Sequence, residues 1–215
     1  LRIMAHLSKD PLLIDAFKKG LDIHTATAAS IFSKDPSEVD KKTRSQAKAI
    51  NFGVLYGQGP HGLSQSAGIS YLEARDFINK YFAHYQGVKK YINKTIKDAE
   101  KSGYTKTMFG RKRSLPEINS SEVMKKKTAE RMAINSPIQG SAADLLKLAM
   151  IEIHEKIKDK NDIKMLLQVH DELIFEVEAD KINLYQKQIK DIMENVVKLD
   201  IPLIVETYSG DNWGE

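Results

Sequence analysis

The sequence predicts an α+β fold, in which a large helical block precedes a small, mostly antiparallel sheet. Apolar residues recur with helical spacing through much of the chain, for example over residues 71–85 and 141–158. After Asp162 the pattern changes to short apolar runs of strand length, which predict a hairpin. Helical spacing then returns over residues 181–197, and residues 203–208 are expected to form a final strand.

Polar residues of the kind that cap helix N-termini mark three helix starts. They are Asp22 before residues 24–32, Asp35 and Glu38 on either side of Pro36–Ser37, and Ser70 with Glu73 before residues 71–85. Such residues accept hydrogen bonds from the N–H groups that the first helical turn leaves unpaired.

A longer helix is predicted over residues 121–135, with Asn119 and Glu122 at its start. Pro137 is expected to break or kink this segment, because proline has no N–H and its ring crowds the preceding turn. A second helix is expected over residues 141–158.

The hairpin is predicted from two apolar runs, residues 165–169 and 173–177, which we expect to be buried strands. Between them lie His170, Asp171 and Glu172. Adjacent acidic residues in a turn are usually solvated. This pair alone therefore does not identify a metal site.

Composition narrows the class of protein. The chain has 215 residues, of which 41% are hydrophobic, enough for a real core in one or two domains. It has no cysteine, which excludes disulfides and thiolate metal sites and permits a reducing compartment. No apolar run approaches the roughly 20 residues of a membrane span, and no signal peptide is found. The net charge of +4 is compatible with nucleic-acid binding. Because Leu1 is not methionine, we expect the chain to begin inside a longer protein.

The segment 44–57 is the most informative part of the chain. Arg44, Lys48, Phe52 and Tyr56 recur every four residues and would share one helix face about 18 Å long. Spaced cations suit a polyphosphate, and flat rings suit a nucleobase. This face could therefore hold a nucleoside triphosphate. The alternative is that the rings are ordinary core and the cations a solvated rim.

Two glycines favour the functional interpretation of this face. Gly53 and Gly57 interrupt the helical pattern, and each costs about 1 kcal/mol relative to alanine. Such a cost indicates close approach by another group or a bend that moves. A different glycine pattern, residues 57–62, fits the dinucleotide fingerprint but follows a helix rather than a strand, and Pro60 interrupts it. We interpret it as the turn after the helix.

Several motifs resemble those of family A DNA polymerases, the bacterial DNA polymerase I type. The helix motif of that family is similar to RSQAKAINFGVLYG, and its second palm carboxylate motif is similar to QVHDELIFEV. LRIMAHLS, DIHTATA and ERMAINSPIQGSAADLLKLAM also match in order and approximate spacing. The resemblance runs from Leu1 to about Trp213.

This resemblance implies a subdomain plan and an activity. Residues 1–21 would belong to the palm, residues 22–116 would be helical fingers, and residues 117–215 would be palm with the carboxylate hairpin. The activity would be template-directed DNA synthesis, the transfer of a deoxynucleotide from a dNTP to a primer 3′-hydroxyl by a two-Mg²⁺ mechanism. The expected partners are primer-template DNA and dNTP, with no membrane and a monomeric state. The protein would be cytoplasmic and nucleoid-associated in a bacterium, or organellar in a eukaryote.

The resemblance also implies roles for individual residues. Asp171 would ligate metal and Glu172 would support it, and both would be catalytic together with Lys48. The nucleotide would be bound by His24, Arg44, Lys48, Phe52 and Tyr56. Phe52 would also discriminate against dideoxynucleotides. DNA near the insertion site would be contacted by Arg131, Asn135, Gln139 and His170.

The chain departs from the family at one motif. The first palm motif, Asp-Tyr-Ser-Gln-Ile-Glu, is not found in the sequence, so the two-metal site would be incomplete and the 215-residue chain alone is expected to be inactive. Two alternatives stay open here. A single-subunit RNA polymerase has a similar basic helix, and a non-catalytic nucleic-acid-binding module would keep the fold without the chemistry.

Lysines and arginines are concentrated between Lys101 and Arg131, and this basic cluster is either a solvated surface or a binding surface. Such clusters are usually solvated, but beside these motifs this one favours contacts with the phosphate backbone of a nucleic acid.

Overall fold

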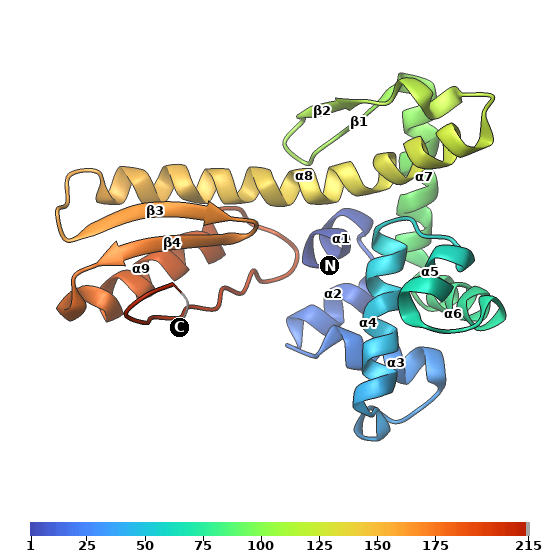
Figure 1. Cartoon of the computed structure of the whole chain (residues 1–215), viewed down its shortest axis with the longest axis horizontal. Helices are drawn as coiled ribbons and strands as arrows, with labels where there is room; N and C mark the ends of the chain where they lie inside the picture. The colour runs from blue at the N-terminus through green and yellow to red at the C-terminus, as the bar shows by residue number, and fades with distance from the viewer. Residues whose placement is uncertain (214–215) are drawn as a thin grey trace. The chain divides into compact units, whose positions relative to one another are not determined.

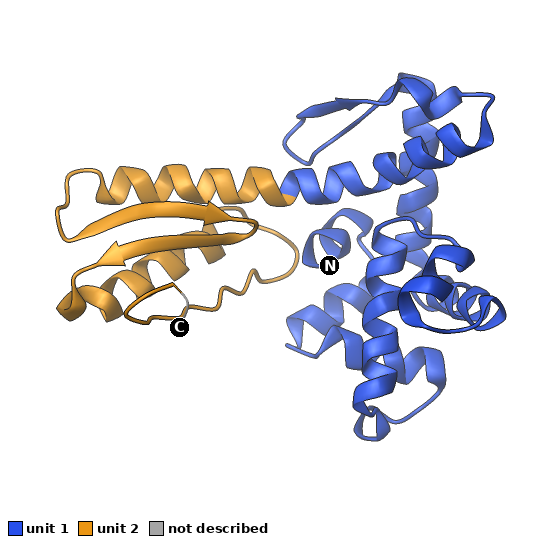
Figure 2. Ribbon diagram, viewed as in Figure 1, with its two compact units in different colours: residues 1–141 blue, residues 142–215 orange. Residues whose placement is uncertain are grey.

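The computed structural model describes residues 1–213, and these residues divide into two units, 1–141 and 142 onward (Figure 2). The first unit is helical apart from one short hairpin (Figure 1). Its elements are α1 (Arg2–Ser8), α2 (Pro11–Lys18), α3 (Ile23–Phe32), η1 (Pro36–Glu38), α4 (Lys41–Leu55), α5 (Pro60–Ala67), α6 (Tyr71–His84), α7 (Gln86–Ser102), β1 (Tyr104–Lys106), β2 (Lys112–Ser114), η2 (Pro116–Asn119) and the first part of α8 (Val123–Ile157).

The second unit packs a two-stranded antiparallel sheet against two helices. Its elements are the rest of α8, β3 (Ile163–Val169), β4 (Glu172–Val177), η3 (Ala179–Lys181) and α9 (Ile182–Asn195). The helical block followed by small antiparallel sheets confirms the α+β class predicted from the sequence.

The three predicted helix starts are confirmed. The Asp22 carboxylate accepts a hydrogen bond from the Thr25 N–H at 2.7 Å and caps α3. Complete capping boxes begin η1 and α6. The expected turn after α4 is confirmed over residues 57–59, and the rest of the glycine-rich segment, Pro60 to Gly62, is the first turn of α5, with Gly59 as its N-cap.

Pro137 does not break the long helix into two, as the sequence allowed, because α8 continues through it. A kink at Pro137 stays a prediction. Proline cannot donate to the carbonyl one turn earlier, which is that of Ala133. In this fold the Thr105 hydroxyl donates to the Ala133 carbonyl at 3.4 Å. A neighbouring strand thus replaces the lost hydrogen bond, a compensation that helix periodicity alone does not reveal.

The expected start of that helix at Asn119 is also wrong. Asn119 ends η2, and its amide donates to the Glu100 carbonyl at 2.8 Å instead of capping α8. The α8 helix begins at Val123, and just before it the Glu122 N–H donates to the Ser120 hydroxyl.

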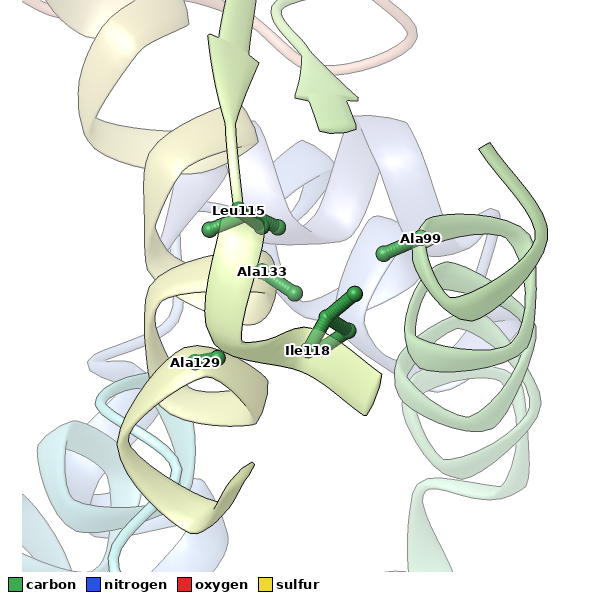
Figure 3. Close-up of a cluster of buried hydrophobic side chains, with 5 residues drawn as sticks. All are labelled: Ala99, Leu115, Ile118, Ala129 and Ala133. Carbon is green, nitrogen blue, oxygen red and sulfur yellow. The ribbon is translucent and has the colours of Figure 1, made fainter. Parts of the chain in front are cut away.

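Small side chains bring α7, η2 and α8 together in a buried cluster (Figure 3). Leu115 and Ile118 fill the space beside Ala99, Ala129 and Ala133, and each of the five is at most 3% exposed. Alanines at these positions allow the helix backbones to approach closely, so the first part of α8 is held firmly within the first unit.

The second unit contains the predicted hairpin, but its strands are less buried than expected. β3 and β4 pair antiparallel, with Val169 opposite Glu172. One face of the hairpin packs against a core of α8 and α9 residues, while Leu166 and Leu167 are about half exposed. The final strand expected over residues 203–208 is not formed, and the Val205 N–H donates to the Glu194 carboxylate rather than to a strand.

The short β1–β2 hairpin was not anticipated. Its strands have three residues each and are rich in lysine and arginine, so they carry no apolar alternation. Its position depends on contacts with α8, where the Arg111 guanidinium donates to the Gly140 carbonyl at 3.1 Å.

A buried carboxylate joins two helix N-termini in the first unit. Asp10 is 1% exposed and accepts hydrogen bonds from Leu12 and Leu13 at the start of α2 and from Gly87, at 2.7 Å, at the start of α7. A Cβ on Gly87 would lie 2.7 Å from the Asp10 Cα, so only glycine fits there.

We predict that Asp10→Ala lowers the free energy of unfolding by about 2–4 kcal/mol, because several buried N–H groups lose their acceptor. The matched control is Asp15→Ala. This carboxylate pairs with Lys19 across two largely exposed side chains, so its loss should cost about 0.5 kcal/mol or less. Urea unfolding followed by circular dichroism measures both, and equal losses would contradict the role given to Asp10.

Candidate nucleotide face and carboxylate hairpin

The predicted stripe lies along α4 and continues to its C-cap, Tyr56. Arg44 and Phe52 are half-buried, whereas Lys48 and Tyr56 are exposed. The opposite side of α4 is core, with Ala47 and Ile50 fully buried. The four residues therefore share one accessible helix face, as their spacing predicts.

The two rings of this face are arranged as a platform. Phe52 and Tyr56 are stacked, with centroids 6.2 Å apart and planes inclined by 19°. Offset stacking of this kind leaves ring faces available to a third flat group. Tyr56 is 39% exposed, so its ring is accessible from solvent.

His24 joins this face from α3, which packs beside α4 (Figure 1). Its ring centroid is 5.8 Å from that of Phe52. Burial is the main cause that lowers the pKa of His24 below its usual value, with a contribution from the nearby Arg44 and Lys48 cations, whereas the Asp22 carboxylate opposes the shift. These surroundings favour the neutral imidazole.

The Arg44 guanidinium is fixed by the residue that caps α3. Its Nε and Nη2 atoms donate to the two Asp22 carboxylate oxygens at 3.2 and 2.5 Å. The hydrogen bond from Arg44 is the largest cause that lowers the pKa of Asp22 well below its usual range. In the part of the chain that the structure describes, Lys48 has no ion-pair partner, so its ammonium is available for a ligand.

A buried hydrogen-bond network lies behind His24. Asn51 is 0% exposed, and its amide nitrogen lies 3.1 Å from the His24 Nδ1 and 3.1 Å from the Thr27 hydroxyl. The Thr27 hydroxyl is in turn 3.1 Å from that of Tyr85. Sequence reasoning missed these residues. The available signal was Asn51 itself, an amide at a position of α4 that the helical pattern assigns to the core.

The glycines at the end of α4 are explained by close approach. A Cβ on Gly53 would lie about 3 Å from Gln58 and Leu63 side-chain atoms. Gly57 has a φ of +64°, a left-handed conformation that favours glycine. A Cβ there would also approach the Arg131 side chain of α8 at 3.2 Å. Movement at these glycines stays a prediction.

The residues predicted to contact DNA lie one turn apart on the first part of α8. Arg131 and Gln139 are exposed, and Asn135 is half-buried between them. The Arg131 guanidinium donates to the Thr128 hydroxyl at 3.1 Å. The buried Oδ1 of Asn135 accepts no hydrogen bond from the described residues. Because buried acceptors are usually hydrogen-bonded, a donor from a bound molecule would be favourable there.

In the second unit, His170 and Asp171 form the two-residue turn between β3 and β4. His170 has a φ of +53°, a conformation that costs a non-glycine residue about 1–2 kcal/mol. The Gln168 side-chain amide donates to the His170 carbonyl at 3.2 Å and stabilises the turn. Backbone strain is commonly found at functional sites, and here it presents the following carboxylates at the hairpin tip.

Asp171 and Glu172 suit a hard cation in their chemistry. Both are exposed, and neither forms an ion pair with another described residue, so their oxygens are available as ligands. Mg²⁺ prefers such carboxylate oxygens. Within residues 1–213 no group of three or more acidic or histidine side chains converges as a metal site. The hairpin therefore fits part of a metal site.

Comparison with known proteins identifies the class. The family model described as DNA polymerase family A matches residues 1–215. The chain belongs to this family, which favours the DNA polymerase over the RNA polymerase alternative.

Its relatives are bacterial DNA polymerases I. The chain is 48% identical to DNA polymerase I of Caldicellulosiruptor bescii and 46% identical to that of Bacillus subtilis, matching 100% and 99% of this chain but 25% and 24% of those proteins. It thus spans about a quarter of their length. It also resembles a solved structure, the POL domain of Pol1 from M. smegmatis in complex with DNA primer-template and dNTP. The TM-score is 0.89 and the identity 44%, over 94% of this chain and 36% of that one.

The sequence predicts no membrane-spanning helix, and the helices of the structure can be checked for one. Of the helices within residues 1–213, none combines the length and the apolar character that a membrane span requires.

We predict a pH-dependent contribution to stability from the Asp22–Arg44 pair, tested with Asp22→Asn. Asparagine also caps helices, so this change keeps the α3 cap and removes the charge. Because the pKa of Asp22 is lowered in the fold, its contribution is present above the unfolded pKa of about 3.9 and is lost as the pH falls toward the folded pKa.

The expected loss in Asp22→Asn is about 0.5–1 kcal/mol at neutral pH, since both side chains are nearly half exposed. It should shrink as the pH falls below about 4. Unfolding free energies of the two proteins at about pH 7 and about pH 3 measure this difference. A difference that grows on acidification would contradict the assignment.

Proposed function

We propose that this chain forms the fingers and the C-terminal part of the palm of a template-directed DNA polymerase. The observation that carries the proposal is the accessible α4 face with His24 beside it, where two cations, an imidazole and a stacked ring pair lie together. In the proposed plan residues 1–21 belong to the palm, residues 22–116 to the fingers and residues 117–215 to the palm. In a bacterium, as in its relatives' sources, the proposed place is the cytoplasm beside the nucleoid.

The α4 face would bind the incoming dNTP. Lys48, Arg44 and His24 would contact the triphosphate, with Lys48 placing its unpaired ammonium where charge develops on the leaving group. Arg44 would act from a fixed position, because its side chain is held by Asp22. Phe52 would flank the sugar and base, and Tyr56 would occupy the template-base position until the fingers close.

The α8 face would support the primer-template near the insertion site. Arg131, Asn135 and Gln139 offer donors to the acceptors that every base pair presents in the minor groove, so they would test the shape of a pair without reading its sequence. The basic β1–β2 hairpin beside Gln139 would contact phosphates. His170 would lie near the primer end.

Asp171 and Glu172 would hold Mg²⁺, which supplies activation of the primer 3′-hydroxyl and neutralisation of the triphosphate when bound. Both carboxylates are exposed and directly follow the strained backbone of His170, so they would be presented together to a cation. Because the family's first palm motif is not part of these 215 residues, we propose that a polypeptide of this sequence alone does not extend primers.

The test is a chimera in which this chain replaces the matching segment of Bacillus subtilis DNA polymerase I. We expect primer extension by the chimera and none by the 215-residue polypeptide. Lys48→Ala should lower kcat about 100-fold or more with a smaller change in KM, because it acts on developing charge. Asp171→Asn should abolish extension.

The control is Lys18→Ala, an exposed cation at the end of α2 that should leave the rate unchanged. A chimera that folds and binds primer-template but never extends it would favour the non-catalytic module. Robust extension by the isolated chain would contradict the proposed incompleteness.

We further predict that Phe52→Tyr in the chimera eases incorporation of dideoxynucleotides. An added hydroxyl on this ring would supply a hydrogen bond near the sugar that a dideoxynucleotide lacks. The ratio of chain termination to extension measures the effect, and an unchanged ratio would count against a role for Phe52 at the sugar.

A further inference from the structure

The buried amide of Asn51 contacts the side chain that the proposed function places on the triphosphate. Asn51 lies on α4 and His24 on α3, and the Asn51 amide nitrogen is 3.1 Å from the His24 Nδ1. Asn51 is 0% exposed, so its polar atoms must be satisfied within the fold. The direction of each hydrogen bond in this network decides which nitrogen of His24 carries a proton.

The two buried hydroxyls can both be satisfied within this network. Thr27 and Tyr85 each have one hydroxyl hydrogen, and they are 0% and 2% exposed. Their oxygens lie 3.1 Å apart, and the Thr27 oxygen lies 3.2 Å from the Asn51 Oδ1. If Tyr85 donates to Thr27, Thr27 donates to the Asn51 Oδ1, and every hydroxyl hydrogen has an acceptor.

The placement of the amide sets the direction of the last hydrogen bond. The Asn51 nitrogen lies 3.1 Å from both the His24 Nδ1 and the Thr27 oxygen, and the Asn51 Oδ1 accepts from the Thr27 hydroxyl at 3.2 Å. An amide nitrogen can only donate, so the His24 Nδ1 must accept from it. The network therefore runs from Tyr85 through Thr27 and Asn51 and ends on His24.

Acceptance of this hydrogen bond fixes the tautomer of the imidazole. A neutral imidazole has one N–H and one bare nitrogen, so a bare Nδ1 requires the proton on Nε2. The surroundings favour the neutral form, since burial and two nearby cations lower the pKa of His24. The Nε2 atom has no hydrogen-bond partner in the described part of the chain and is free to donate.

We propose that Asn51 is a positioning residue that holds His24 as its Nε2–H tautomer, so that His24 offers the triphosphate a neutral, directed hydrogen-bond donor. This inference rests on the proposed nucleotide site and extends it. A third cation beside Arg44 and Lys48 would be repelled by both, whereas a neutral N–H donates to a phosphate oxygen without that repulsion. Asn51 would act without touching the nucleotide.

The primary test is the tautomer of His24 in the 215-residue chain, read from the imidazole nitrogen shifts in long-range ¹H–¹⁵N spectra. His24→Gln assigns its signals among the six histidines. We expect the proton on Nε2 at neutral pH. A proton on Nδ1 in the wild-type chain would overturn the inference, and this reading requires neither a variant nor a ligand.

Two variants separate positioning from packing. Asn51→Asp places an acceptor opposite Nδ1 and should move a proton onto that nitrogen. Thr27→Val removes a buried hydroxyl of the same network but leaves the Asn51 amide beside His24, so the Nε2–H form should persist. If Thr27→Val changes the tautomer as much as Asn51→Asp does, the specific role of Asn51 is refuted.

A titration with dATP and Mg²⁺ connects the tautomer to the ligand. We expect the His24 Nε2 signal to shift on binding, and Asn51→Asp to weaken binding about tenfold, the worth of one good hydrogen bond to a charged group. Thr27→Val should weaken it less than about twofold. Equal weakening by the two variants would overturn the role in binding. An Nε2–H tautomer with no response to dATP would refute the nucleotide site while leaving the Asn51–His24 contact established.

Discussion

The packing of α3 against α4 depends on a buried chain of hydrogen bonds that runs from Tyr85 through Thr27 and Asn51 to His24. Each polar group of this chain would cost about 1–3 kcal/mol if a shift of either helix left it unpaired. The network therefore fixes the register between the two helices more sharply than apolar contacts would, because apolar surfaces tolerate small displacements. The proposed nucleotide face takes His24 from one helix and its other residues from the second, so its geometry depends on this register.

The charges of the same face follow from that arrangement. Asp22 caps the start of α3 and accepts hydrogen bonds from the Arg44 guanidinium. Because Arg44 lies in the first turn of α4, this pair joins the first turns of the two helices. Lys48 stays exposed one turn further along α4. The face thus combines the fixed Arg44 cation, the available Lys48 cation and the His24 imidazole with the stacked rings of Phe52 and Tyr56. Such preorganisation lowers the cost of ordering side chains when a charged ligand binds.

Two exceptions to regular structure in the first unit are each compensated by a specific neighbour. Pro137 interrupts the hydrogen bonds of α8, and Thr105 satisfies the carbonyl that it leaves. The buried Asp10 carboxylate accepts from the ends of two helices, and Gly87 makes room for it. A third exception is the left-handed backbone of His170, whose carbonyl accepts a hydrogen bond from the Gln168 side chain and which lies beside the proposed metal-binding carboxylates.

Local chemistry was sufficient to predict the helix caps at Asp22, Asp35 and Ser70, although not the start of α8. It also predicted the shared face of Arg44, Lys48, Phe52 and Tyr56 and the hairpin before and after Asp171, because each depends on residues within a few positions of one another. The family motifs supplied the roles of those residues, which spacing alone left open. The same local reasoning failed at Pro137 and at residues 203–208. At the first site the Thr105 hydroxyl replaces the lost hydrogen bond, and at the second the Val205 N–H donates to the Glu194 carboxylate of α9. It also missed Asn51, because the role of a buried amide in a helix depends on its hydrogen-bond partners, and these lie on another helix. The sequence by itself determined which side chains share a helix face, because helix geometry is periodic. Only the tertiary structure decided which buried polar atoms meet across helices, because hydrogen-bond partners far apart in the chain are chosen by packing.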